Sequence, residues 1–166
     1  NLYLLTAPVR MRGPSVTTLD FRLMLSKVRQ QFDYCLLDAP AGLGEGFRLA
    51  VCAADRCVVV TTQDPSSLRD AQHTVMELRT FGPGCLHLVV NRVKRKLLRS
   101  MHATIDDAID KAGLPLIGVV PEDDALPLAL NRGVPLLLAS YGGAASAYRN
   151  IAIRLQGGRV PLLRIK

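Results

Sequence analysis

Six apolar runs of strand length recur along the chain, and the intervals between them leave room for a helix. Each run is almost continuously hydrophobic instead of alternating with polar residues. This pattern is typical of strands that are covered on both faces, as in a parallel sheet. The six runs are residues 2–6 (LYLLT), 34–39 (YCLLDA), 56–62 (RCVVVTT), 86–91 (LHLVVN), 115–120 (PLIGVV) and 134–139 (VPLLLA).

The segments between these runs have the spacing and the boundary residues of helices. Residues 17–32 fit a helix with basic side chains toward water (Arg22, Lys27 and Arg29) and an apolar face opposite (Leu19, Leu23, Val28 and Phe32). Helices are also predicted at 66–81, 104–112 and 143–156, where Pro, Thr or Gly residues mark the boundaries. Strands and helices that alternate in this way predict an α/β fold, a doubly wound, mostly parallel sheet with helices on both faces.

Length and composition fit one folded domain that spans residues 1–166. A chain of 166 residues can bury one substantial core and is short for two. Its hydrophobic share of 49% and charged share of 21% are ordinary for a globular protein and exclude a disordered one. No apolar run reaches the roughly 18 residues that a membrane-spanning helix needs.

The chain is basic, and its formal net charge of +7 would attract phosphates, nucleic acid or an anionic membrane surface. An otherwise unremarkable basic surface explains the charge equally well. Aromatic residues make up 5% of the chain, and none is interleaved with the basic cluster at residues 92–99. A platform that stacks nucleic-acid bases is therefore disfavoured.

The four cysteines and three histidines give no sign of a metal centre. No C-x-x-C pair occurs, and the histidines are separated from one another and from the cysteines. The cysteines lie in or beside apolar runs, which predicts buried free thiols and a reducing cytoplasm. The missing C-x-x-C pair also disfavours an iron–sulfur carrier.

The run at residues 34–39 ends near a carboxylate, Asp38, which Pro40 and Gly42 follow. Ligands of parallel sheets bind beyond the carboxyl ends of the strands. An apolar strand that ends in Asp has the Walker-B pattern, in which the carboxylate orients a Mg²⁺-bound water near nucleotide phosphates. Gly42 has no Cβ and could bring its N–H close to a terminal phosphate. A tight turn from strand to helix would explain the same proline and glycine.

Several separated segments resemble the MinD family of septum-site-determining ATPases, within the ParA/MinD group of deviant P-loop proteins. The resemblance begins at DAPAGLGEGFRLAVCAADRCVVVTTQDPSSLRDAQ (38–72) and continues through LVVNRV (88–93). It extends through GLPLIGVVPEDDALPLALNRGVPLLL (113–138) to AYRNIAIRLQGGRVPLL (147–163). The segments follow the family's order and cover nearly the whole chain, which makes their agreement more specific than any one motif.

The resemblance implies a catalytic and metal-binding end of a nucleotide site in the first third of the chain. Asp38 would be the Walker-B carboxylate, which holds Mg²⁺ through water, and Gly42 would lie in the switch region beside the γ-phosphate. Asp70 matches an acidic position near the family's signature lysine and its activator-binding surface. An ordinary acid in the first turn of a helix, favoured by the helix dipole, explains Asp70 as well.

The resemblance places the base-binding end of the site in the second half of the chain. Asn91 matches the residue that commonly reads the adenine edge, since a side-chain amide both donates and accepts hydrogen bonds. The loop that packs around the base, largely through backbone groups, corresponds to the PEDD segment, which begins with Pro121, Glu122 and Asp123. Asn131 and Arg132 match the family's NRG segment, for which a structural role in a loop is expected.

The family's phosphate-binding loop does not occur in this chain. No G-x-x-x-x-G-K-[ST] motif is present in the 166 residues. The resemblance implies that the motif precedes Asn1, so that the chain corresponds to about the C-terminal two-thirds of a P-loop NTPase-like domain. Because phosphoryl transfer depends on positioning by that loop, its lysine and Mg²⁺, the isolated chain is expected neither to bind ATP tightly nor to hydrolyse it. Unpaired apolar sheet edges are expected to favour aggregation or a rearranged sheet.

For the whole protein, the resemblance implies an ATPase that uses ATP and Mg²⁺ and helps to place the division septum. The implied partners are a second copy in an ATP-dependent homodimer, division-inhibitor and activator proteins of the Min type, and an anionic membrane surface. The implied location is the cytoplasm, in peripheral contact with the inner face of the cell membrane. The last residues, GGRVPLLRIK, contain Pro161 and offer too little apolar face for stable anchoring.

Two alternatives to the division role stay open. One is a flagellar-number or chromosome-partition ATPase of the ParA type, in which the positive charge would serve DNA binding. The other is a non-catalytic interaction module that kept the fold and lost the P-loop. An in-frame P-loop upstream of Asn1 would exclude the second alternative.

Overall fold

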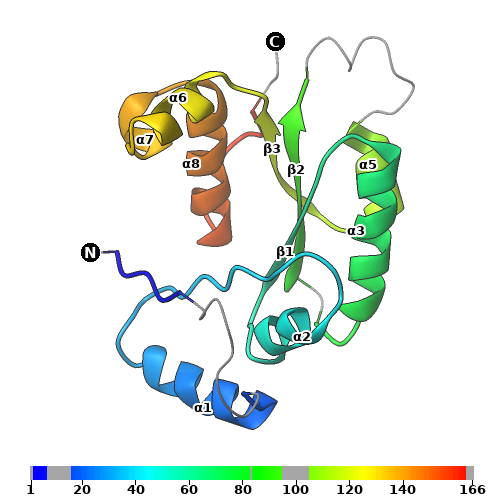
Figure 1. Ribbon diagram of the computed structural model, residues 1–166. Helices are drawn as coiled ribbons and strands as arrows, with labels where there is room; N and C mark the ends of the chain where they lie inside the picture. Colours follow the sequence, from blue (N-terminus) through cyan, green and yellow to red (C-terminus); the bar gives the residue numbers. More distant parts are fainter. Residues whose placement is uncertain (1, 7–15, 83, 95–104, 164–166) are drawn as a thin grey trace. The chain divides into compact units, whose positions relative to one another are not determined.

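The computed structural model describes residues 2–6, 16–82, 84–94 and 105–163, with the backbone alone in residues 105–108 (Figure 1). The chain divides into two compact units, Asn1–Ala54 and Asp55–Lys166. Every strand that the structure describes lies in the second unit. Across the described residues, no helix is both long enough and apolar enough to cross a membrane.

A parallel sheet of three strands, in the order β1–β2–β3, forms the centre of the second unit. The strands are β1 (Cys57–Thr61), β2 (Leu86–Val93) and β3 (Leu116–Pro121). They correspond to three of the six apolar runs. Successive residues of β2, from Leu88 to Val90, are all buried, which is possible because helices cover both faces of the sheet. The predicted doubly wound α/β fold is therefore confirmed.

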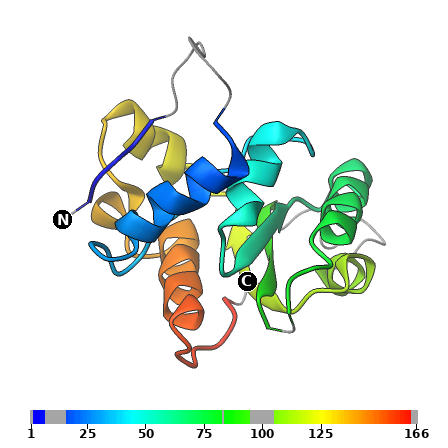
Figure 2. The same cartoon turned by 90° about the horizontal axis from the view of Figure 1, so that it is seen from below.

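Helices lie on both sides of this sheet (Figures 1 and 2). On one side are α3 (Pro65–Glu77) and α5 (Ile105–Ala112). On the other are α6 (Ala125–Asn131), α7 (Leu136–Ala139) and α8 (Gly143–Leu155). The predicted start of α3 and the predicted ends of α5 and α8 are close to those observed: α3 begins with Pro65, and Gly113 and Gly157, both with positive φ, follow α5 and α8. The predicted end of α3 at residue 81 is wrong, because this helix ends at Glu77. The predicted cap of α5, Thr104, lies outside the described residues.

Small residues let α8 pack closely on the sheet. Ala144, Ala145 and Ala147 are buried against Ile117 and Val120 in one hydrophobic core. At position 118 of β3, a Cβ would overlap the side chain of an isoleucine of α8, so the sequence supplies glycine there. The small side chains therefore determine how near the helix lies to β3.

The first unit contains two short helices that polar contacts join. They are α1 (Thr18–Val28) and α2 (Glu45–Cys52). Thr17 and Asp20 form a capping box at the start of α1, which fits the predicted start of this helix. In the middle of α1, Arg22 Nε donates to the carbonyl oxygen of Cys52, the last residue of α2, at 2.8 Å. The helix ends at Val28, before the predicted end at residue 32.

The predicted apolar face of α1 is wrong. Leu19 and Leu23, expected to be covered, are 65% and 55% exposed, whereas Leu25 is the residue of this helix that is buried. The basic residues are exposed, as predicted, and one of them, Arg22, also donates to α2. The described part of the first unit contains no sheet that the apolar face could cover, and α1 packs on α2 instead.

Three of the predicted strands are absent from the described residues. Residues 2–6 and 34–39 form no strand, and Leu36 is 91% exposed. A strand needs a neighbouring backbone to satisfy its N–H and C=O groups, and neither segment pairs with a described strand. In the run 134–139, α7 forms instead. Pro135 precedes it without an N–H for a sheet ladder, and leucine and alanine favour helix.

Candidate functional site at the carboxyl end of the sheet

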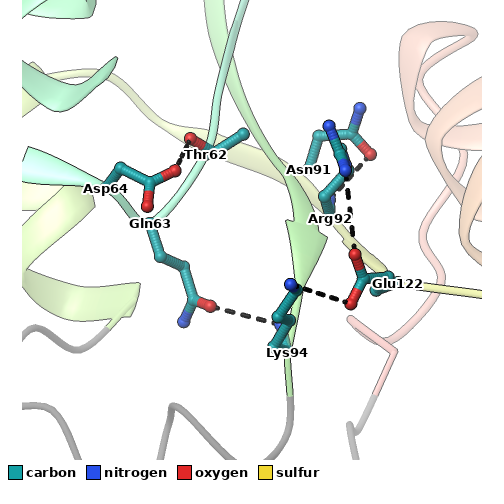
Figure 3. Close-up of polar contacts among 7 residues, drawn as sticks. All are labelled: Thr62, Gln63, Asp64, Asn91, Arg92, Lys94 and Glu122. Carbon is teal, nitrogen blue, oxygen red and sulfur yellow. Dashed lines mark hydrogen bonds and ion pairs between the residues drawn. The ribbon is translucent and has the colours of Figure 1, made fainter. Parts of the chain in front are cut away.

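Polar residues of the second unit gather where the three strands end. Because the strands are parallel, their carboxyl ends meet at one edge of the sheet, which is where ligands of such sheets bind. The predicted base-end residues lie at this edge: Asn91 near the end of β2, and Pro121, Glu122 and Asp123 where β3 ends. Figure 3 shows Asn91 and Glu122 with their polar neighbours, Thr62, Gln63, Asp64, Arg92 and Lys94.

A β-bulge shapes the end of β2. From Val90 to Val93 this strand advances by three residues, while its neighbour β3 advances by two, from Val119 to Pro121. The extra residue allows Val90 and Val93 both to be buried, and the two residues between them stand at the edge of the sheet. Arg92 in this bulge has a φ of +53°, a left-handed conformation that residues other than glycine adopt infrequently.

The carboxamide of Asn91 is fixed by its neighbour in the bulge. Its Oδ1 accepts a hydrogen bond from the backbone N–H of Arg92 at 2.9 Å (Figure 3). A backbone N–H needs an acceptor, so this contact identifies the oxygen of the amide and puts the nitrogen on the other side. Within the part of the chain that the structure describes, Asn91 therefore keeps both N–H donors and one oxygen lone pair for another molecule.

Glu122 connects the end of β3 to the end of β2. Its carboxylate lies 3.8 Å from Nη2 of Arg92 and 3.5 Å from Nζ of Lys94, and its N–H donates to the carbonyl of Val93 at 3.0 Å. The N–H of Lys94 donates in turn to Oε1 of Gln63 at 3.3 Å. All three charged side chains are at least 39% exposed, so these ion pairs orient the side chains and contribute little to stability.

The side chain of Asp123 serves two helices. Its Oδ1 accepts from the N–H of Ala125 at the start of α6, and its Oδ2 from the N–H of Ala144 at the start of α8, both at 2.9 Å. Gly143 has a φ of +52°, and a Cβ at this position would overlap the Asp123 carboxylate. Both carboxylate oxygens of Asp123 thus accept hydrogen bonds within the protein. The contact of the PEDD segment with a base stays a prediction.

Asp70 lies in the second turn of α3 and is exposed. The first turn of α3 contains no acidic residue, so the explanation of Asp70 as a first-turn acid favoured by the dipole is wrong, because the dipole effect fades beyond the first turn. At the start of α3, Asp64 accepts a hydrogen bond from Oγ1 of Thr62 at 2.7 Å. The role of Asp70 at a partner surface stays a prediction.

Asp38 and Gly42, the predicted phosphate and metal end of the site, belong to the first unit. Asp38 is exposed and follows irregular backbone. The prediction that it ends a buried strand is therefore wrong, because residues 34–39 pair with no described strand. Gly42 has a φ of +85°, a conformation that glycine adopts without strain. The residues that the structure describes contain no cluster of three or more His, Cys, Asp or Glu that could hold a metal ion. A single carboxylate acting through a metal-bound water needs no such cluster.

Asn131 and Arg132 end α6. The N–H of Arg132 donates to the carbonyl of Ala129 at 3.1 Å, and Gly133 follows with a φ of +63°. The N–H of Val134 returns to the same carbonyl at 3.0 Å. These bonds satisfy a terminal carbonyl of the helix, which supports the expected structural role of the NRG segment.

The cysteines and His87 are outside the edge cluster. All four cysteines are free, as predicted, but Cys35 is exposed and the other three are only half-buried. Burial raises the pKa of the Cys57 thiol, and the neighbouring Cys85 adds to the shift. Burial also lowers the pKa of His87, with a further contribution from Arg56, and His87 Nδ1 has no partner among the described residues. These shifts favour the neutral forms of both groups.

Several residues of the edge cluster were not predicted as site residues. Arg92 was counted in the basic cluster 92–99, of which residues 95–99 lie outside the described part of the chain. Nothing in the sequence marks its left-handed conformation, because glycine is the usual sign and arginine stands there. Gln63 and Lys94 carry no motif either, and their contact depends on the pairing of β1 with β2.

Curated relatives match nearly the whole chain. The septum site-determining protein MinD of Synechocystis sp. is 32% identical over 165 residues, which cover 98% of this chain and 62% of the relative. MinD of Bacillus subtilis is 35% identical over 165 residues, covering 97% of this chain and 61% of the relative. The chain thus spans about three-fifths of the length of these relatives. No protein-family profile matches it.

Solved structures agree with the sequence comparison. MinD of Aquifex aeolicus superposes with a TM-score of 0.82 at 30% identity, covering 89% of this chain and 64% of the other. The MinC:MinD complex of the same organism gives 0.81 at 30% identity, covering 89% and 62%. MinD of Pyrococcus horikoshii in complex with Mg-ADP gives 0.69 at 23% identity, covering 84% and 56%, and shares the fold. By sequence and by fold, the chain is therefore similar to MinD proteins over nearly its whole length.

Proposed function

We propose that this chain forms the base-reading part of a MinD-type ATPase that binds ATP together with Mg²⁺. The observation that carries the proposal is the meeting of Asn91 and the PEDD segment at the carboxyl edge of the parallel sheet. The Nδ2 donors of Asn91 have no partner among the described residues, and nucleotides bind at this edge in doubly wound sheets. The MinD relatives that cover the chain support the same function.

Each end of the nucleotide has its own candidate residues. Asn91 reads the adenine edge, and Pro121, Glu122 and Asp123 line the base through backbone groups. At the phosphate end, Asp38 orients a water bound to Mg²⁺, and the N–H of Gly42 contacts the γ-phosphate. Mg²⁺, when bound, would be held through water by Asp38 and would offset the negative charge of the phosphates. The position of Asn91 beside the PEDD segment, at the carboxyl edge of the sheet, supports the roles proposed at the base. The exposed carboxylate of Asp38 is chemically suited to accept a hydrogen bond from a Mg²⁺-bound water.

The isolated 166 residues are proposed to be inactive. They contain no G-x-x-x-x-G-K-[ST] motif, whose amides and lysine supply most of the binding energy for phosphates. Base contacts alone leave the triphosphate charge unpaired. Weak nucleotide binding and no turnover are therefore expected for this chain by itself.

The proposed cellular role is placement of the division septum by the whole protein. In this role, ATP joins two copies into a homodimer, which contacts an anionic membrane surface from the cytoplasm, at the inner face of the cell membrane. Asp70, exposed on α3, contributes to the surface for division-inhibitor and activator proteins of the Min type. The MinD names of the relatives and the solved MinC:MinD complex support this role.

Nucleotide titration of the full-length native protein and of the isolated chain tests the proposal. The full-length protein is expected to bind and hydrolyse ATP in a Mg²⁺-dependent way, and the isolated chain to do neither. Asn91→Ala should weaken ATP binding by about tenfold, the cost of losing a bidentate amide contact to adenine. Asn131→Ala is the matched control, because this exposed asparagine ends α6. Turnover by the isolated chain, or equal losses in both variants, would contradict the proposal.

Membrane and DNA binding by the full-length protein separate the division role from its alternative. Sedimentation with anionic phosphatidylglycerol vesicles should require ATP. Strong DNA binding that falls steeply with added salt, without vesicle binding, would instead favour a chromosome-partition ATPase.

A further inference from the structure

The chain turns back sharply after α8 (Figure 2). Gly157, just beyond the helix, has a φ of +84°, a conformation that glycine adopts at helix ends without strain. The N–H of Gly158 then donates to the carbonyl of Ile153 at 2.9 Å. Residues 158–163, which we call the strap, follow this turn, and Leu163 packs against the hydrophobic core of the second unit.

The guanidinium of Arg154, in the last turn of α8, joins the strap to β3. Its Nε donates to the carbonyl of Val160 at 3.0 Å, and its Nη2 donates to the same oxygen. Its Nη1 donates to the carbonyl of Ile117 in β3 at 2.9 Å. Because the guanidinium is a rigid, planar fork, one side chain fixes the backbone of the strap relative to that of β3.

The carbonyl of Ile117 is available because β3 contains a bulge at this residue. From Leu88 to Val89, β2 advances by one residue, whereas β3 advances by two and reaches Gly118. Ile117 is the extra residue, and the extra residue of a bulge is left out of the ladder. Since Ile117 is buried, its carbonyl needs a partner inside the protein, and Arg154 supplies it.

The edge of β3 that faces away from β2 has no strand beside it among the described residues. Such an edge presents unpaired N–H and C=O groups, which can pair with a strand of another molecule. Natural proteins protect open edges with bulges, prolines and covering loops. β3 combines the bulge at Ile117 with Pro121 at its end, and Arg154 attaches the strap to it.

The strap has few attachments besides Arg154. Residues 158–163 contain no helix or strand, and Pro161 and Leu162 are exposed. The other recorded side-chain hydrogen bond to the strap, from Asn150 to the carbonyl of Pro161, is long at 3.5 Å. Segments with so few contacts open at a lower free energy than the sheet does. The three hydrogen bonds of Arg154 therefore largely decide whether the strap stays closed.

We propose that Arg154 is a latch, which holds the strap on the outer edge of β3 and so prevents this edge from pairing with β3 of a second copy. The inference goes beyond the proposed function, because neither the latch nor the strap belongs to the cluster at the carboxyl edge of the sheet. It assigns to residues 158–163 the control of self-association through β3, separate from the ATP-dependent homodimer.

Substitutions in α8 of the full-length protein test the latch. Arg154→Met removes all three donors and keeps an unbranched apolar stem, whereas Arg154→Lys keeps the charge and loses the planar fork. Arg149→Met is the matched control, because Arg149 is an exposed residue of the same helix. The measurements are the rate of trypsin cleavage after Arg159 in the strap and the mass in solution by light scattering, both without ATP.

The Arg154→Met variant should be cleaved after Arg159 about tenfold faster than the wild-type protein. Its mass should rise with concentration, while the wild-type protein and Arg149→Met stay single copies. A wild-type cleavage rate in Arg154→Met, or an opened strap without self-association, would overturn the inference. If Arg154→Met does not fold, Arg154→Lys decides. One ammonium group cannot reproduce the fork, so faster cleavage and self-association are again expected, and wild-type behaviour overturns the inference.

Amide hydrogen exchange distinguishes pairing at β3 from aggregation of unfolded protein. In the self-associated variant, exchange should slow within residues 116–121, because new partners bind the free N–H groups of the edge. Unchanged or faster exchange there would show that the copies associate in another way and would overturn the inference.

Discussion

Replacing Asp123 should destabilise the protein more than its position in a loop would indicate. The carboxylate accepts N–H groups from Ala125 and Ala144 at 2.9 Å each, and so joins the starts of α6 and α8. A hydrogen bond to a charged group contributes about 1.5–3 kcal/mol. Since Asp123 is half-buried, the lower value applies to each bond, and Asp123→Ala should cost about 3 kcal/mol. Asp123→Asn keeps one acceptor oxygen and should cost about half as much.

Urea unfolding of the full-length protein, followed by circular dichroism, measures this loss. Asp124→Ala is the matched control, because Asp124 is the neighbouring carboxylate and makes no capping hydrogen bond. The control should change the free energy of unfolding by less than about 0.5 kcal/mol. Equal effects of Asp123→Ala and Asp124→Ala, or no loss in Asp123→Ala, would refute the reasoning that one side chain fastens two helices.

Two further predictions concern the sheet. Gly118→Ala should cost about 1–3 kcal/mol of unfolding free energy, since the added Cβ would overlap Ile151. The double variant with Ile151→Ala should recover part of this loss. Gly82→Ala is the control and should be nearly neutral, because nothing lies near its Cβ position. Stability should fall as the pH drops below about 6.5, because unfolded His87 takes up a proton at its ordinary pKa while burial keeps the folded pKa lower. Urea unfolding over a pH series should show a flatter dependence in His87→Gln but not in His73→Gln, since His73 is exposed; an unchanged slope in His87→Gln would contradict this assignment.

The parts of the fold that were predictable depend on local pattern and on burial. The runs that became β1, β2 and β3 are almost continuously apolar, and a strand covered on both faces needs that composition. Helix starts and stops follow from residues such as Pro65 and Gly157, whose backbone preferences act locally. Asn91 and Glu122 could be placed at one edge because the carboxyl ends of parallel strands meet there.

The parts that were not predictable depend on partners far along the chain. Residues 34–39 have the composition of a strand, but a strand forms only where a neighbour supplies hydrogen bonds, and none pairs with them among the described residues. The capping role of Asp123 needs Ala144 to lie beside it, 21 positions further on. The left-handed conformation of Arg92 follows from the register between β2 and β3, which no single residue signals.

The central claim is that the base of ATP binds at the carboxyl edge of the sheet in the second unit. Photolabelling of the full-length protein with 8-azido-ATP and Mg²⁺, followed by mass spectrometry of the labelled peptides, tests it most directly. Labels are expected within residues 91–94 or 121–124, and unlabelled ATP should suppress them. Labels that ATP suppresses at other positions, with none in these two segments, would contradict it.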